Sequence, residues 1–172
     1  MKKTNLLTVI ILVISITSPL QAQLSAIGNI KTEIVVPLSV IETQQLNFGK
    51  ISSAAQGGTI LISPNGERVN TGELSLVDDQ FSAGKFILSG SPNSLISISL
   101  PQTPQVVRLT SGGQELIINQ FISSIPAEGQ LIDQVDGKVV VSIGASLIIG
   151  NSTSGPPPGL YIGMYEVVFM YN

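Results

Sequence analysis

The sequence contains no cysteine, histidine or tryptophan, and only 11% of its residues are charged. Without cysteine there can be no disulfide bond, so the fold must be held by strand pairing and by burial of apolar side chains. The absence of both cysteine and histidine also removes the commonest nucleophile–base pairs of hydrolases. These absences favour a structural or binding role, and we do not expect an enzyme.

Two pairs of acidic residues are the remaining candidates for chemistry, Asp78 with Asp79 and Asp133 with Asp136. Paired carboxylates can serve glycoside hydrolysis, and oxygen-rich loops can bind calcium. Both pairs lie in turn-like segments, and 133–137 has neither the number nor the spacing of ligands found in calcium loops. We therefore expect solvated turns, with no catalytic residue, no metal and no cofactor.

Basic residues are few and isolated. After Lys2 and Lys3 they occur singly, at Lys31, Lys50, Arg68, Lys85, Arg108 and Lys138. A surface that follows a phosphate backbone needs clustered basic side chains. Nucleic acid is therefore not an expected partner.

The first 22 residues have the pattern of a secretory signal peptide. Lys2 and Lys3 precede an uncharged apolar run over 6–16, and Ala22 offers a cleavage site. The run is shorter than the roughly 18–20 apolar residues of a membrane-spanning helix. We expect removal of 1–22, export to the periplasm, the cell surface or the medium, and no transmembrane segment in the mature chain.

Apolar residues alternate along most of the remaining chain, and turn residues interrupt them about every 8–12 positions. This pattern predicts one all-β domain over 38–172, an antiparallel β-sandwich, preceded by an N-terminal arm over 23–37. Strands are predicted over 24–36, 38–43, 46–51, 59–63, 72–77, 84–89, 95–100, 106–110, 114–121, 138–149 and a single final run over 159–172, with a loop over 52–58.

Two long amphipathic segments lie at the ends of the mature chain, the arm and the final run. Terminal strands of this kind can pair within one molecule or exchange between molecules, and the residues alone leave both open. The candidate strand-exchange residues are Leu24, Ala26, Gly28, Ile30 and Ile34 in the arm, and Gly159, Tyr161, Tyr165, Val167, Phe169 and Tyr171 in the final run.

The end of the chain resembles the last strand of chaperone–usher pilins. Tyr171 is penultimate, Phe169, Val167 and Tyr165 alternate before it, and Gly159 stands fourteen places from the end. The arm is similar to a pilin donor strand, because its apolar face carries a glycine and the segment ends at a proline.

The whole mature chain is more similar still to an uncharacterised bacterial domain family related to those pilins and to spore-coat-U-like proteins. The motifs that carry this likeness follow one another in order along nearly the whole domain. They are Leu46-x-Phe48-Gly49, Phe86 with Gly90, Ile143-Gly144-Ala145 with Leu147, and Gly159-x-Tyr161 with Tyr171-Asn172.

The resemblance implies an immunoglobulin-like sandwich, complete or one strand short. In the pilin case a periplasmic chaperone supplies the missing strand first, and the arm of a neighbouring subunit replaces it. The chain would then be a pilin-like structural subunit of a fimbrium that serves cell adhesion. Most pilins carry a disulfide, whereas here Leu38 stands where its first cysteine is expected. The alternative is a self-complemented secreted or surface sandwich that binds a protein or glycan through its loops.

Overall fold

A computed structural model describes residues 24–126, 128–150 and 155–172. The signal-peptide prediction over 1–22 lies outside these residues. The described chain divides into two parts, 24–34 and Val35–Asn172, and each is considered by itself. Its regular structure consists of strands, and within the described ranges no helix is long and apolar enough to cross a membrane.

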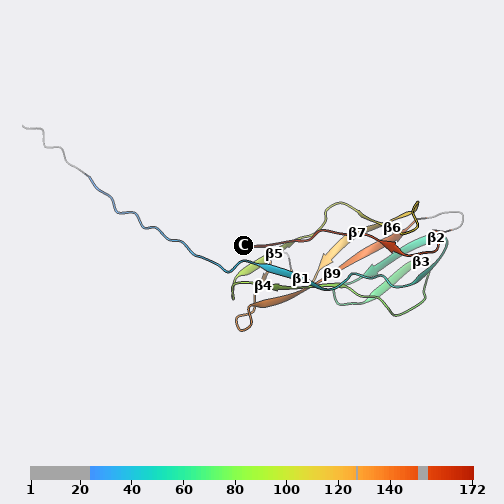
Figure 1. The fold of residues 1–172 in the computed structure, drawn as a ribbon, viewed down its shortest axis with the longest axis horizontal. Coiled ribbons are helices and arrows are strands. Elements are labelled where there is room, and N and C mark those ends of the chain that lie inside the picture. Colours follow the sequence, from blue (N-terminus) through green and yellow to red (C-terminus); the bar gives the residue numbers. More distant parts are fainter. Residues whose placement is uncertain (1–23, 127, 151–154) are drawn as a thin grey trace, which may run out of the picture. The chain divides into compact units, whose positions relative to one another are not determined.

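The Val35–Asn172 part is an antiparallel β-sandwich, which confirms the predicted fold class (Figure 1). The larger sheet comprises β1 (Ser39–Gln44), β2 (Ile51–Ile62), β3 (Arg68–Leu76), β4 (Gly84–Ser89), β6 (Gln105–Leu109), β7 (Glu115–Ser123), β9 (Lys138–Ile149) and β10 (Tyr161–Ile162). The smaller sheet comprises β5 (Leu95–Ser99), β8 (Gln130–Leu131) and β11 (Val168–Tyr171).

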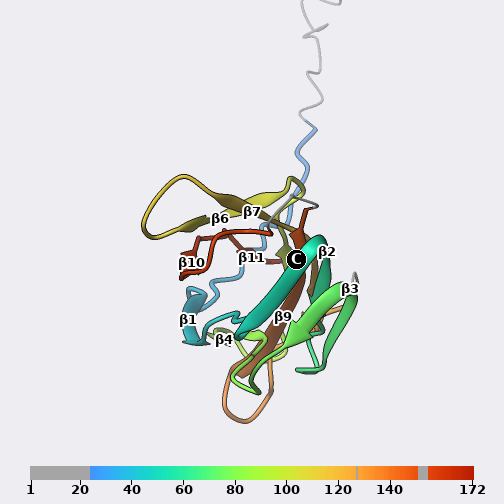
Figure 2. The same cartoon turned by 90° about the vertical axis from the view of Figure 1, so that its right-hand side faces the viewer.

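Strand β9 is the centre of the larger sheet. Along one edge it pairs first with β4 and then with β2, while β7 pairs along its other edge. Strand β1 extends the sheet beyond β4, and β3 extends it beyond β2 (Figure 2). Five consecutive residues of β9, from Ile143 to Leu147, are buried. A side chain at Gly144 would collide with the Ile62 carbonyl oxygen, so close packing explains the small residues of this motif.

Two apolar clusters fill the sandwich. One is built on β2, β7 and β9 and includes Ile60 and Leu147. The other joins the two sheets, with Leu88 and Val141 from the larger sheet against Ile96 from the smaller one. Leu38, just before β1, packs on this second cluster together with Phe86 of β4 and residues of the final run, and these residues take part in the feature described in the next subsection.

The predicted strand over 24–36 is not a strand in the structure. Residues 24–38 carry no regular structure. A strand exists only where a neighbouring segment completes its hydrogen-bonded ladder, and alternation of apolar residues does not supply that neighbour.

The predicted single final strand is divided between the two sheets. Strand β10 pairs with β6 in the larger sheet, and β11 pairs with β5 in the smaller one. At Gly163 the chain approaches β6 so closely that a side chain would collide with the Val106 carbonyl oxygen. Residues 163–167 then cross from one sheet to the other, so the final run contributes a strand at the edge of each sheet.

Three further boundaries differ from the predictions. The small residues over 52–58 lie inside β2, where a register shift between Ser53 and Gly58 absorbs them against β3. Most of 46–51 is instead a connection, with one bridge from Asn47 to Ser82 and a positive φ of 78° at Gly49. Strand β8 was not predicted, because two residues are too few for an alternating pattern to be recognised.

Candidate functional site: a groove between two unpaired strand edges

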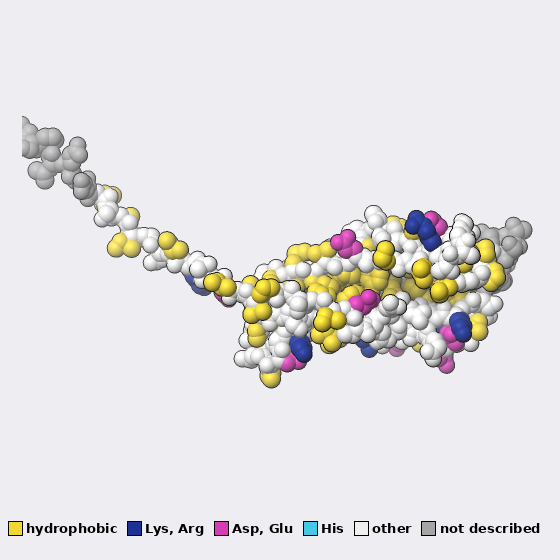
Figure 3. Space-filling view, in the orientation of Figure 1, with side chains coloured by type: hydrophobic (Ala, Val, Ile, Leu, Met, Phe, Trp, Pro, Cys, Tyr) yellow, Lys and Arg dark blue, Asp and Glu magenta, His cyan; other side chains and the backbone are white. Residues whose placement is uncertain are grey.

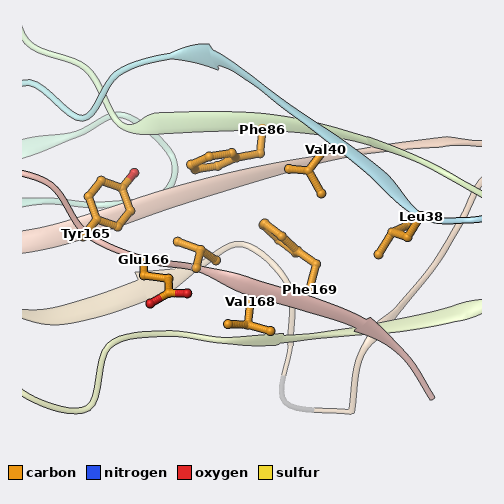
Figure 4. A pocket seen from close by; sticks show the side chains of 8 residues that line it. Leu38, Val40, Phe86, Tyr165, Glu166, Val168 and Phe169 are labelled. Carbon is orange, nitrogen blue, oxygen red and sulfur yellow. The ribbon is translucent and has the colours of Figure 1, made fainter.

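An apolar groove of about 510 Å³ lies between β1 and the final run. Figure 3 shows hydrophobic side chains gathered along a hollow on this face of the domain. Leu38 and Val40 form one wall and Phe169 belongs to the other, with Phe86 of β4 between them (Figure 4). The complete lining is Leu38, Val40, Phe86, Tyr165, Glu166, Val167, Val168 and Phe169.

Both walls of the groove end in an unpaired strand edge. Among the described residues, strand β1 stands at the end of the larger sheet and pairs only with β4. In the same part of the chain, strand β11 stands at the end of the smaller sheet and pairs only with β5. The N–H and C=O groups on these two edges are available to a further strand. The arrangement is therefore a sandwich with one open strand position.

Aromatic rings occupy the middle of the groove. The Phe86 ring lies 5.8 Å from that of Phe169 and 6.5 Å from that of Tyr165, measured between centroids. Tyr165 also stacks on Phe121 at 5.2 Å. The rings of Phe86, Tyr165 and Phe169 form the floor of the groove. Because aromatic rings are wide and rigid, the space above Phe86 suits small side chains better than large ones.

One end of the groove is tied by the Tyr171 hydroxyl. It donates to the Val36 carbonyl oxygen at 2.8 Å and accepts the Ser91 N–H at 2.8 Å. Ser91 Oγ in turn accepts the Val36 N–H at 2.7 Å. A side chain at Gly90 would collide with the Tyr171 hydroxyl, which explains why this motif needs glycine. The last residues thus hold the start of β1 in place.

The other end of the groove is closed by Tyr165. Its hydroxyl is buried and has no hydrogen-bond partner among the described residues. Burial raises the pKa of Tyr165 to about 12, and the negative charge of Glu42 adds to the rise.

The shifted pKa of Tyr165 predicts a loss of stability at high pH. An unfolded tyrosine ionises near pH 10, whereas folded Tyr165 keeps its proton until about pH 12, so over this interval the unfolded chain binds fewer protons. The free energy of unfolding should fall as the pH rises through it. Urea denaturation at about pH 9 and about pH 11 checks this. The Tyr165→Phe variant should show a smaller fall, and an equal fall in both proteins would contradict the assignment.

The predicted strand-exchange residues fall into three places. Tyr165, Val167 and Phe169 line the groove, and Tyr171 ties its end. Gly159 and Tyr161 lie away from the groove; Tyr161 pairs with β6. Leu24, Ala26, Gly28, Ile30 and Ile34 belong to the 24–34 part, and the side chains of Leu24, Ile30 and Ile34 are 94–99% exposed.

Sequence reasoning missed the β1 side of the groove and two outward residues of the final run. Leu38 and Val40 are two positions apart, as residues on one face of a strand are. Their spacing does not indicate, however, that β1 is an edge strand beside the final run. Phe86 was singled out only as part of a motif. Glu166 and Val168 alternate with the inward residues and were not singled out.

Three of the four acidic candidates have structural partners, and the fourth, Asp79, is exposed. Asp78 forms an ion pair with Arg68, and Asp133 and Asp136 accept backbone N–H groups within their own turn. No group of three or more potential metal ligands occurs within the described ranges. These contacts are those of turns and of a structural ion pair.

Comparison with known proteins gives one match. A family model described as a domain of unknown function, DUF4402, matches residues 38–171. No curated protein and no solved structure shows significant similarity to the chain. The matched region begins at Leu38 in the groove wall and ends at Tyr171, so it contains both walls. Because the match covers most of the sequence, the chain belongs to the DUF4402 family.

Proposed function

We propose that the protein is an exported, non-enzymatic structural subunit that assembles by strand exchange, with the N-terminal arm of one copy filling the groove of another. The observation that supports it best is the open strand position between β1 and β11. An apolar groove flanked by two unpaired edges is a site for an added β-strand. The same chain also carries, in its N-terminal arm, a segment with the alternating apolar pattern of such a strand.

The apolar row of the arm suits this groove. Leu24, Ile30 and Ile34 share one face of an extended chain and are almost fully exposed. Each such side chain that becomes buried contributes about 1.5–3 kcal/mol gross. Ladder hydrogen bonds on both edges would add to this gain, and lost motional freedom would reduce it. An arm bound in this way would dissociate slowly from the groove.

Two partners follow from this proposal. The first is another copy of the chain or a related subunit, whose arm fills the groove in the assembled state. The second is a periplasmic chaperone, since an unfilled apolar groove needs cover before assembly. Export depends on the predicted signal peptide, and the fibre that results would serve attachment at the cell surface.

The proposal predicts polymers that survive mild detergent. Mature protein, purified without heating, should give a ladder of species on an unheated dodecyl sulfate gel, and boiling should reduce the ladder to one band. A buried arm explains this result because both the ladder bonds and the apolar contacts must break together. Monomer alone, at every protein concentration tested and with an intact arm, would refute the proposal and favour the self-complemented monomer.

A further inference from the structure

Resting on the proposed function, we propose that the incoming arm adopts one register, antiparallel to β11 and to residues 165–167 that lead into it, in which its Lys31 lies opposite Glu166. Glu166 is then a specificity-determining residue of the groove. Of the eight described residues that line the groove, only Glu166 is charged. Lys31 is the only basic residue between 24 and 36. The pair would therefore join the one acidic wall residue to the one basic residue of the arm.

The two charged side chains lie on matching faces. In the final run Tyr165, Val167 and Phe169 are half-buried, while Glu166 and Val168 are exposed on the opposite face (Figure 4). When the apolar row of the arm faces the groove, its odd-numbered residues face outward. Lys31 is odd-numbered, so it emerges on the same face as Glu166.

The register that this charge pair fixes also agrees with the positions of the aromatic rings on the groove floor. In antiparallel pairing, Lys31 opposite Glu166 places Gly28 opposite Phe169, whose ring packs on Phe86. The residue without a side chain thus meets a pair of neighbouring aromatic rings. Ile30 falls opposite Val167, where no aromatic ring stands on the wall.

The same register brings a hydroxyl to the closed end. Thr32 falls opposite Tyr165, which lines that end of the groove.

The parallel orientation lacks these matches. If the arm ran parallel to β11 with Lys31 beside Glu166, Ile34 would meet Phe169 and Ile30 would meet Tyr165. Gly28 would then fall opposite Gly163, beyond the groove, and a large side chain would meet the Phe86–Phe169 pair. The charge pair and the position of glycine therefore agree only in the antiparallel register.

The absence of cysteine allows this register to be tested by cross-linking. Ile27→Cys and Met170→Cys are made as separate single variants, mixed during assembly and oxidised. Positions 27 and 170 are opposite each other in the proposed register, and both side chains are exposed, 97% and 46%. The expected result is a disulfide-linked dimer of the two variants. Val35→Cys mixed with Met170→Cys is the matched control, because positions 35 and 170 meet only in the parallel register.

Charge reversal provides a second measurement. Glu166→Lys should slow ladder formation several-fold, and combination with Lys31→Glu should restore the rate. Cross-linking of 35 with 170, or of neither pair while wild-type ladders form, would overturn the register and leave strand exchange standing. A ladder rate unaffected by Glu166→Lys would overturn the role of Glu166. Absence of wild-type ladders would instead overturn the proposed function, and the register with it.

Discussion

Replacing Ile30 with aspartate is expected to abolish assembly, whereas the same replacement at Ile27 should leave it intact. The two side chains are almost equally exposed, 99% and 97%, so neither change should disturb the fold of the arm's own subunit. In an inserted arm Ile30 faces the apolar groove, while Ile27 faces solvent. An unpaired carboxylate buried there costs about 4 kcal/mol, which weakens association about a thousandfold.

Sedimentation and unheated gels of the two variants measure this difference. Circular dichroism spectra of both should match the wild type, which separates failed assembly from failed folding. Assembly of the Ile30→Asp protein at wild-type rates would show that the arm's even-numbered row does not enter the groove. Equal loss in both variants would show that exchange does not distinguish the two faces.

Replacing Asp78 with alanine is expected to lower the free energy of unfolding by about 3–5 kcal/mol, the usual cost of breaking a buried ion pair from one side. The Arg68 side chain is 3% exposed and lies 3.9 Å from Asp78 Oδ1. It also donates to the carbonyl oxygens of Phe48 and Asp78, and it lies over the Phe81 ring at 4.2 Å. Without the carboxylate, a buried guanidinium loses its counter-charge.

Asp78 also fixes the neighbouring connection, which adds to the expected loss. Its Oδ1 atom accepts the Lys50 N–H at 2.9 Å and the Gln80 N–H at 3.3 Å. Asp78→Asn keeps an acceptor oxygen but removes the charge, so its effect should be smaller than that of alanine. Asp79→Ala, at the exposed adjacent position, is the control and should change stability little. Urea denaturation curves give all three values, and equal stability of Asp78→Ala and the wild type would contradict the role assigned to the pair.

Strands whose alternation is bounded by turn residues were predicted well. The predicted bounds 84–89 and 138–149 are those of β4 and β9. Both have many apolar residues between clear polar or glycine-containing flanks. The connection at 46–51 was read as a strand because Leu46 and Phe48 alternate, but these residues pack on the first cluster from a connection held by Arg68 and Asp78. A partner twenty residues away is not visible in local periodicity.

The groove could be predicted on one side only. Tyr165, Val167 and Phe169 were identified because they alternate in the final run, and the groove is lined by all three. The opposite wall depends on β1 being an edge strand, which is a property of the sheet order and not of residues 38–44 themselves. The division of the final run between two sheets is likewise invisible, because apolar alternation continues through both β10 and β11.

The two walls of the groove belong to different sheets, and this has a mechanical consequence. Within the described ranges no backbone ladder joins β1 to β11; they are held together by apolar contacts of Leu88, Ile96 and Val141, and at one end by the Tyr171 hydroxyl bonded to the Val36 carbonyl oxygen. The groove can therefore widen without breaking a ladder hydrogen bond. A strand seated in it would be bonded to both sheets at once. Tension along a chain of such subunits would then load those bonds in shear, so that many must break together before two subunits part.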